Sequence, residues 1–331
     1  MSGLKLHFIV LRLALCLVTG SGIGASGTAF SQTWPARPVK IVVPFPPGNG
    51  TDILARLMSP KMSDSLRQPV IVDNRGGANG TIGAELVAHA APDGYTILFT
   101  SPSTHVTSLF LSKNLPYDPV KDFTPITAAV EPVTVMTVSP SLPVNSLKEL
   151  IDYAKKNPGK LNYSSPGVGA VFHMSGELFK LGAGVDIIHV PYKGAAPALA
   201  GVIAGEVGIG FNSLASVLPH LRSGRVKVLA VLEANRYPGQ PQIPSIAEVL
   251  PGFEKPASWF GLFGPAGLPP PVLGRLHAEL VKSLREPDVR VKIDELAMAL
   301  IASTPEQFAA MLKGGIDQYG RLIKAAGIQP E

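Results

Sequence analysis

The stretch VVPFPPGNGTD at Val42–Asp52 decides the fold that the sequence predicts, and NRGGANGTIG at Asn74–Gly83 repeats its plan. Each begins in an apolar, β-branched run, passes through glycine or proline to Asn-Gly-Thr, and enters a segment whose apolar residues have helical spacing. We therefore expect a strand, a tight loop and a helix start at both places. Because Asn-Gly is a common turn dipeptide, either stretch alone is also compatible with an ordinary strand-to-helix turn.

Strand-like and helix-like segments alternate along most of the chain, which indicates parallel βαβ units and an α/β fold. Two four-residue segments, one beginning at Ser146 and one at Ser245, match the capping box of a helix start. The predicted strands are Val39–Val43, Val70–Val72, Tyr95–Thr100, Asp186–Val190, Val207–Phe211 and Val226–Val231. The predicted helices are Ile53–Met62, Thr81–Ala90, Leu147–Lys156, Ala195–Ala204, Ala215–Ser223, Val272–Leu284 and Pro305–Ala325.

The order of these segments predicts two lobes. Residues 138–251 alternate strands and helices as a block of their own, and SWFGLFGPAGLPPP at Ser258–Pro271 then returns to a strand and a proline-rich turn. We expect residues 32–137 and 252–331 to form the first lobe and residues 138–251 the second, with crossing strands as a hinge. A tandem of two independent domains is also compatible with this pattern.

The first 31 residues have the features of a secretory signal peptide. A basic start is followed by an apolar stretch from Phe8 to Val18 and by small residues that end at Ser31. A transmembrane anchor is the alternative, but the apolar stretch is shorter than the roughly 20 residues that a membrane span needs. We therefore expect residues 1–31 to be removed and the mature protein to begin near Gln32.

The mature chain is expected to be weakly basic and free of cysteine. The whole chain has 29 Lys and Arg and 24 Asp and Glu, and the loss of Lys5 and Arg12 leaves 27 against 24, a net charge of +3. These basic residues form no run or aromatic-interleaved patch, so a nucleic-acid partner is not expected. The single cysteine, Cys16, lies in the signal segment. An exported chain without disulfides fits the periplasm of a Gram-negative bacterium.

The two Asn-Gly-Thr loops have the features of an anion site. In open α/β sheets, ligands bind beyond the carboxyl ends of the strands, where helix starts present free N–H groups and a positive dipole end. Such loops hold anions without a charged side chain. Their glycines allow close backbone approach, Asn49 and Asn79 tolerate the left-handed region, and Thr51 and Thr81 can cap their helices or donate a hydroxyl.

A third loop, NYSSPGVGAVFH at Asn162–His173, repeats the design in the middle block. His173 is expected either to orient this loop or to contact a ligand, and an orienting role is the commoner one for a histidine at a helix start. HVPYKGAAPAL and GFNSLAS are further strand ends in the same block. They offer Tyr192, Lys193, Phe211, Asn212 and Ser213.

An enzyme is the main competing interpretation. The sequence has no G-x-S-x-G nucleophile elbow, and its seven histidines form no H-E-x-x-H or similar metal spacing. A Ser165–His173 pair as nucleophile and base remains an alternative, without an identifiable acid partner. We therefore expect neither catalysis, nor a metal, nor a cofactor.

Taken together, the motifs closely resemble the periplasmic solute-binding receptors of the tripartite tricarboxylate transporter family, often called Bug-type receptors. The resemblance covers nearly the whole mature chain and depends on the order of the motifs. These are WPARPVKIVVPFPPGNGTD, VIVDNRGGANGTIGAE, PDGYTIL, LPYDPVKDFTPI, YSSPGVGAVFHMSGELF, VPYKGAAPAL, PHLRSGRVKVLAV and WFGLFGPAGLP.

The resemblance implies a type II periplasmic-binding-protein fold, in which two α/β lobes are joined by crossing hinge strands. It also implies a small organic carboxylate held between the lobes by backbone N–H groups and bridging waters, with integral membrane transporter subunits as partners of a monomeric receptor. The implied ligand-binding residues of the first lobe are Phe45, Gly48, Asn49, Gly50, Thr51, Asp52, Ala78, Asn79, Thr81, Ser101 and Ser103. Those of the second lobe are Ser165, Gly167, Val168, Gly169, His173, Tyr192, Phe211 and Asn212.

The sequence departs from the family pattern at three of these positions or beside them. The family usually has glycine at the positions of Asn49 and Asn79, and a Ser or Thr at the position of Ala170. These changes leave the identity of the carboxylate open. A periplasmic sensor that reports the same ligand to a membrane kinase is an alternative to a transport receptor.

Overall fold

Val39–Val43 forms strand β1 where the sequence predicts it, and four of its five side chains are buried. It lies in register between two parallel neighbours, β2 (Val70–Asn74) and β3 (Thr96–Thr100), so the apolar run is covered on both faces. The structure is a computed structural model that describes residues 34–329. The predicted signal peptide lies outside the described residues.

The first sheet has six strands in the order β11-β4-β10-β3-β1-β2. β3 pairs with β10 in antiparallel orientation, and β4 pairs with β10 and β11 in the same way, so the sheet is mixed and adds antiparallel strands to the predicted parallel units. The three strands that complete it are β4 (Phe123–Pro132), β10 (Phe260–Pro265) and β11 (Met298–Leu300).

Helices cover both faces of the first sheet. One face carries α2 (Gly50–Leu66), α9 (Pro270–Arg285) and α10 (Pro287–Glu295), and α2 packs directly on α9. The other face carries α3 (Thr81–Ala88) and α11 (Pro305–Ala325). Short turns connect them: η1 (Ala78–Gly80), the π-helical η2 (Ser103–Thr107) and α4 (Ser108–Leu111).

The second sheet has five strands in the order β7-β6-β8-β5-β9. Its strands are β5 (Thr134–Val138), β6 (Leu161–Ser165), β7 (Ile187–Pro191), β8 (Ile209–Ser213) and β9 (Lys227–Val231). The residues buried together show that α5 (Leu147–Lys156) and α6 (Val171–Ala183) lie on one face, and α7 (Ala195–Ala204) and α8 (Leu214–Arg222) on the other. The one-turn helix η3 (Ile246–Glu248) follows β9.

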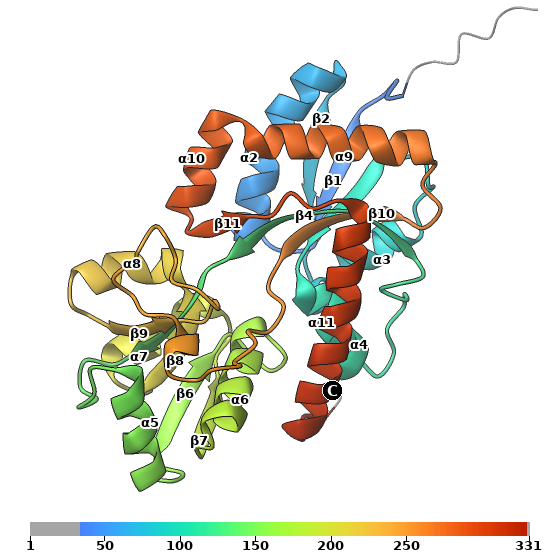
Figure 1. Cartoon of the computed structure of the whole chain (residues 1–331). Helices are drawn as coiled ribbons and strands as arrows, with labels where there is room; N and C mark the ends of the chain where they lie inside the picture. Colours follow the sequence, from blue (N-terminus) through green and yellow to red (C-terminus); the bar gives the residue numbers. More distant parts are fainter. Residues whose placement is uncertain (1–33, 330–331) are drawn as a thin grey trace, which may run out of the picture. The chain divides into compact units, whose positions relative to one another are not determined.

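Two segments run from one sheet to the other (Figure 1). β4 of the first sheet continues through Val133 into β5 of the second, and the chain returns through residues 251–259 into β10. We call each sheet with its helices a lobe, so the predicted arrangement of two α/β lobes joined by crossing strands is confirmed. β5 begins at Thr134, four residues before the boundary that the sequence suggested.

The capping boxes are formed in part. Ser146 caps α5 by accepting from the Glu149 N–H at 3.2 Å, but the Glu149 carboxylate accepts from the Asn145 N–H and not from that of Ser146. Ser245 and Glu248 form the complete reciprocal box, although the helix that follows is a single 3₁₀ turn. Among residues 34–329, no helix is long and apolar enough to cross a membrane.

Candidate ligand-binding cleft

A cavity of about 630 Å³ lies between the two lobes, at the ends of their strands. Of the residues expected to bind a ligand, it is lined by Gly50, Asn79, Ser101, Ser103, Gly167 and Val168. Ser213, which the sequence offered at a strand end, also lines the cleft. Further residues come from the crossing segments and from elements distant in the chain, and the sequence did not single them out. They include Ile53, Pro132, Thr134, Phe172, Ser216, Ser258, Trp259, Phe260, Leu296 and Met298.

Most side chains of the first loop form hydrogen bonds that stabilise the loop. The carboxylate of Asp52 accepts from the Gly48 N–H at 2.8 Å, from Arg56 Nε at 3.0 Å and from Asn74 Nδ2 at 3.0 Å. Burial by itself would raise the pKa of Asp52, but the hydrogen bonds from Arg56, Gly48 and Asn74 together lower it below its usual value. Asp52 is therefore ionised and stabilises the loop through these hydrogen bonds, and it does not line the cleft.

Asn49 is the N-cap of α2, a role that the sequence assigned to Thr51. Its Oδ1 accepts from the Asp52 N–H at 3.0 Å, and its φ of −77° is extended, so the left-handed geometry considered for Asn49 is not used. Thr51 Oγ1 donates to Asn49 Oδ1. The Phe45 carbonyl accepts a hydrogen bond from Asn74 Nδ2 at 3.1 Å. Only Gly50 from this loop reaches the cleft, where the first N–H groups of α2 have no intrahelical acceptor.

The second loop does use the left-handed region. Asn79 has a φ of 57°, and its carbonyl accepts from Thr104 Oγ1 at 3.0 Å, which joins the loop to η2. Asn79 lines the cleft, whereas Ala78 and Thr81 line a neighbouring cavity of about 640 Å³ that also includes Asn79 and Val168. The N-cap position of α3 is held by Gly80, so Thr81 is not a cap.

Ser101 and Ser103 follow β3 and both line the cleft, as the resemblance implied. Their hydroxyl oxygens lie 2.8 Å apart, so one donates to the other and the pair has a further donor to offer. Ser103 also begins η2, and its carbonyl accepts from Ser108 Oγ at 3.0 Å. The two hydroxyls are therefore fixed by the turn that carries them.

In the second lobe, the buried His173 and the half-buried His189 orient the third loop. His173 Nδ1 accepts from the Gly169 N–H at 3.0 Å, and the His173 ring stacks on that of His189 with centroids 3.9 Å apart. Burial, with the nearby His189 and Lys180, lowers the pKa of His173 to about 3, and burial lowers that of His189 to about 4. Both rings are neutral at neutral pH and provide no positive charge for a ligand.

Ser165 is buried below the loop and pairs with His189, not with His173. Its Oγ lies 2.6 Å from His189 Nε2 and accepts from the Gly167 N–H at 3.2 Å. The carboxylate of this cluster, Glu177, accepts from Tyr163 Oη at 2.6 Å and from Lys180. Because Ser165 does not line the cleft, this cluster supports the loop that presents Gly167 and Val168.

The other predicted residues of the second lobe do not line the cleft. Phe211 is buried in the core of that lobe, and Asn212 Nδ2 donates to Thr137 Oγ1 at 2.9 Å within the sheet. Tyr192 directs its hydroxyl to Glu206 at 3.3 Å. Gly169 instead lies against α4, because a Cβ placed on it would clash with Leu111. Lys193, considered as a charge at the mouth, is exposed and outside the lining.

The electrostatic character of the cleft comes from backbone and hydroxyl groups. Within residues 34–329, none of the side chains that line it carries a formal charge. The starts of α2, η2, α6 and α8 open toward it, through Gly50, Ser103, Val171 and Ala215. Helix starts favour anions, so the cleft is suited to a carboxylate. No group of three or more possible metal ligands occurs in the described part of the chain.

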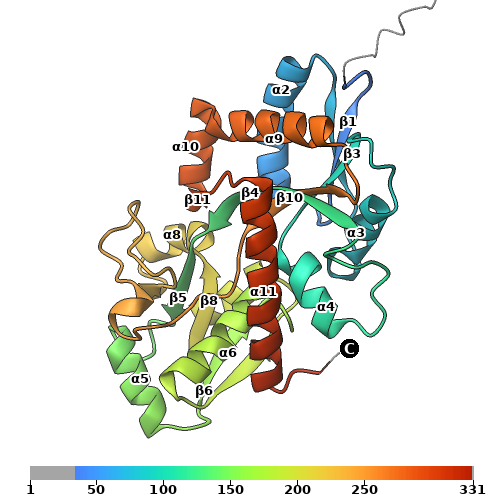
Figure 2. The ribbon, with the colours of Figure 1, turned by 45° about the vertical axis from the view of Figure 1, so that its right-hand side comes forward.

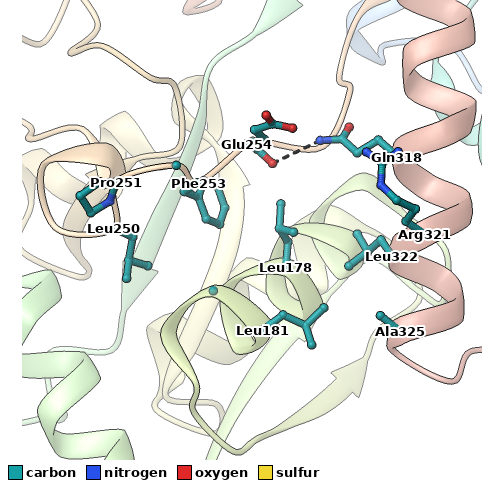
Figure 3. Close-up of a pocket in the computed structure, with 12 residues that line it drawn as sticks. Leu178, Leu181, Leu250, Pro251, Phe253, Glu254, Gln318, Arg321, Leu322 and Ala325 are labelled. Atoms are coloured by element: carbon teal, nitrogen blue, oxygen red, sulfur yellow. Dashed lines mark hydrogen bonds between the residues drawn. The ribbon is translucent and has the colours of Figure 1, made fainter.

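A second cavity, of about 570 Å³, lies between α6, the returning segment and α11 (Figure 3). Leu178 and Leu181 of α6 point into it from one side, and Arg321 and Leu322 of α11 from the other. The Glu254 carbonyl above it accepts from Gln318 Nε2 at 3.3 Å. No helix start or glycine loop of the predicted site lines this cavity, so the cleft between the lobes is the candidate ligand site.

Comparison with known proteins gives a family match over most of the chain. Residues 54–328 match the family described as tripartite tricarboxylate transporter family receptor. Protein BugT of Bordetella pertussis is 33% identical over 318 residues, which cover 95% of this chain and 97% of BugT.

Solved structures agree with this match. A structure of R. palustris Rpa4515 with adipate has a TM-score of 0.80 and 36% identity, and the match covers 90% of this chain and 100% of that one. MatC (Rpa3494) from Rhodopseudomonas palustris with bound malate has a TM-score of 0.75 and 33% identity, with 88% and 100% covered.

Proposed function

This chain belongs to the tripartite tricarboxylate transporter family of receptors, and from that membership we propose that it is a periplasmic receptor for a small carboxylate. It would capture the ligand between its two lobes and deliver it to the integral membrane subunits of a transporter. The matching family is described as a receptor family, which supports ligand binding as the activity of this chain.

The observation that carries the proposal is the cleft itself. It joins Gly50, Asn79 and Ser103 of one lobe to Gly167 and Ser213 of the other, and most of these residues stand at or beside a helix start. Free N–H groups and hydroxyls are the donors that hold a carboxylate when no cationic side chain is present. Rpa4515 and MatC, with adipate and malate, support the extension of this ligand class to the present chain.

A thermal-shift screen of organic acids tests the proposal. A ligand at about 100 times its dissociation constant adds roughly 2.7 kcal/mol of stability, which raises the melting temperature measurably. We expect at least one mono-, di- or tricarboxylate to produce this shift. If only sugars, metal ions or cationic solutes shift the melting temperature, the carboxylate proposal is wrong.

The variant Gly167→Leu tests whether the acid binds in the cleft. Gly167 lines the cleft with a φ of 147°, a conformation that leucine rarely adopts, so the substitution both displaces the loop backbone and fills the space beside it. We expect the variant to fold and to lose the response to the acid. Gly224→Leu is the control, because Gly224 also has a positive φ, of 67°, but lies outside the cleft with open space around it.

Export is the second part of the proposal. N-terminal sequencing of the protein purified from the periplasm should give a start near Gln32, whereas an intact Met1 would contradict export by cleavage. Light scattering of the mature protein should give the mass of a monomer.

A further inference from the structure

The lining of the cleft changes from polar to apolar across the strand ends of the first sheet. Of the cleft residues that follow β1, β2 and β3, the polar ones are Asn79, Ser101 and Ser103, which lie after β2 and β3, whereas Gly50 and Ile53 belong to the first turn of α2. At the opposite side, where β10, β4 and β11 lie, the aromatic and aliphatic side chains prevail. The cleft therefore has a polar end after β2 and β3 and an apolar end that runs from the first turn of α2 to β10 and β11.

Contacts within the first lobe build the polar end. The hydroxyls of Ser101 and Ser103 lie 2.8 Å apart, and the next residue, Thr104, donates to the Asn79 carbonyl at 3.0 Å. The third loop of the second lobe reaches the same place, because Val168 lines the cavities on both sides of Asn79. Hydroxyls of the first lobe thus meet Val168 and the start of α6, at Val171, from the second lobe, and this combination suits one carboxylate.

The apolar end is built over the first turn of α2. A Cβ placed on Gly50 would lie 2.7 Å from Phe260 Cε2 and 3.2 Å from Met298 Cε, so both side chains pack against this turn. Ile53 and Leu296 extend the same wall into the cleft. A carboxylate placed against Ile53, Phe260, Leu296 and Met298 would lose hydration without gaining a charged or hydroxyl partner from them, whereas a hydrocarbon group would gain from burial.

The apolar end also has polar neighbours. Ser258 Oγ donates to Glu131 Oε1 at 3.2 Å, Thr134 contributes a hydroxyl, and the start of α8 faces this end. The Leu214 N–H donates to the Val133 carbonyl at 2.9 Å, and Met298 pairs in register with Pro132, so α8 begins beside the same crossing segment. Its two hydroxyls are engaged with each other, since Ser213 Oγ donates to Ser216 Oγ at 3.1 Å. A second carboxylate would therefore meet the Thr134 hydroxyl and the backbone of this helix start.

We propose that the preferred ligand carries one carboxylate and an apolar body, as in a medium-chain or aromatic monocarboxylic acid. This inference rests on the proposed function and names the ligand class of the same cleft. The carboxylate is held at the Asn79, Ser103 and Gly167 end, and the body lies on the wall formed by Ile53, Phe260, Leu296 and Met298.

Calorimetric titration with hexanoate and adipate tests this directly, because the two acids have the same chain length and differ in a terminal methyl or carboxylate. We expect hexanoate to bind at least tenfold more tightly than adipate, and benzoate more tightly than terephthalate. Equal or tighter binding of the dicarboxylates overturns the inference and leaves the receptor function intact. If no carboxylate of either kind binds, the proposed function itself fails.

Met298→Lys should reverse the preference, because it places an ammonium group in the apolar wall. We expect its ratio of hexanoate to adipate affinity to fall at least tenfold. Ala299→Lys is the control, because Ala299 is the exposed neighbour on the same strand and does not line the cleft. Ile53→Lys, at a half-buried position of the same wall, provides a second variant if Met298→Lys does not fold. An unchanged ratio in the folded variant overturns the assignment of the apolar wall.

Discussion

His105 is a buried histidine whose protonation would destabilise the folded protein. Its ring stacks on Phe263 with centroids 4.1 Å apart and meets Phe123 edge-on at 4.4 Å, while neither ring nitrogen has a hydrogen-bond partner in the described residues. Burial lowers the pKa of His105 to about 3. An imidazole held neutral in an aromatic cluster is a site where the charged form destabilises the fold.

We predict that His105→Phe reduces the acid sensitivity of the protein. Folded pKa values of about 3 for His105 and His173 and about 4 for His189 lie below the unfolded value of about 6.5. As the pH falls through this window, the unfolded chain binds protons that the folded chain does not, so the free energy of unfolding falls by about 1.4 kcal/mol per pH unit for each histidine.

The variant removes one of these three contributions. Urea unfolding from about pH 7 to about pH 4.5 should therefore show a shallower decline for His105→Phe than for the parent. His89→Gln, at an exposed position, is the control and should follow the parent. A decline as steep as that of the parent would show that His105 does not titrate in this way.

At the scale of elements, the two crossing segments are tied together by one buried lysine. Lys255 lies on the returning segment with 9% of its side chain exposed, and its Nζ lies 2.7 Å from Glu131 Oε1 and 2.7 Å from Glu233 Oε1. Glu131, the residue before the last of β4, accepts from Ser258 Oγ at 3.2 Å, and Glu233 accepts from the Thr134 N–H at 3.0 Å. The hinge is thus held by a single cation between two carboxylates of different lobes.

Lys255→Met should lower the free energy of unfolding by roughly 2 to 4 kcal/mol, because it leaves two carboxylates facing each other in a partly buried site. Denaturant unfolding measures this change. Lys148→Met is the control, since the Lys148–Asp152 pair is exposed and its loss should change stability by less than about 0.5 kcal/mol. A loss as small as that of the control would show that the hinge does not depend on Lys255.

At the scale of the molecule, the lobes touch outside the crossing segments. Met174 of α6 is fully buried in a core cluster of the first lobe, with Leu178 packed against it, and α11 lies alongside α6 (Figure 2). On the other side, Ala297 after α10 is buried in a core cluster of the second lobe. The cavity of Figure 3 opens between the same two helices, α6 and α11, so a hinge motion would change its shape as well as that of the cleft.

Ligand binding should close the lobes. A ligand that contacts both lobes favours the closed form by its additional contacts there, so small-angle scattering should give a smaller radius of gyration at saturation with an acid found in the screen. Gly167→Leu, treated with the same acid, should keep the radius of the free protein. An unchanged radius of the parent at saturation would contradict closure.

The sequence by itself determined the elements whose signals are local. α5, α7 and α11 occupy the predicted residues, and β1 does so as well, because apolar periodicity and capping residues act within one or two turns. The left-handed conformation of Asn79, with a φ of 57°, also agrees with the tolerance that the sequence predicted for this residue. The tripartite tricarboxylate transporter family was also evident from motif order. The predicted lobe boundaries stay a prediction.

Only the tertiary structure decided which side chains meet in the cleft. Asp52, Ser165 and Asn212 lie at the predicted loops, but each is engaged by partners from neighbouring segments and faces away from the cavity. Ile53 and Met298, in contrast, are 245 positions apart and carry no motif, yet antiparallel pairing brings β10 and β11 beside the start of α2. Local residues specify a helix start and the chemistry that it offers, whereas the ligand class depends on long-range packing, which no single stretch of the chain encodes.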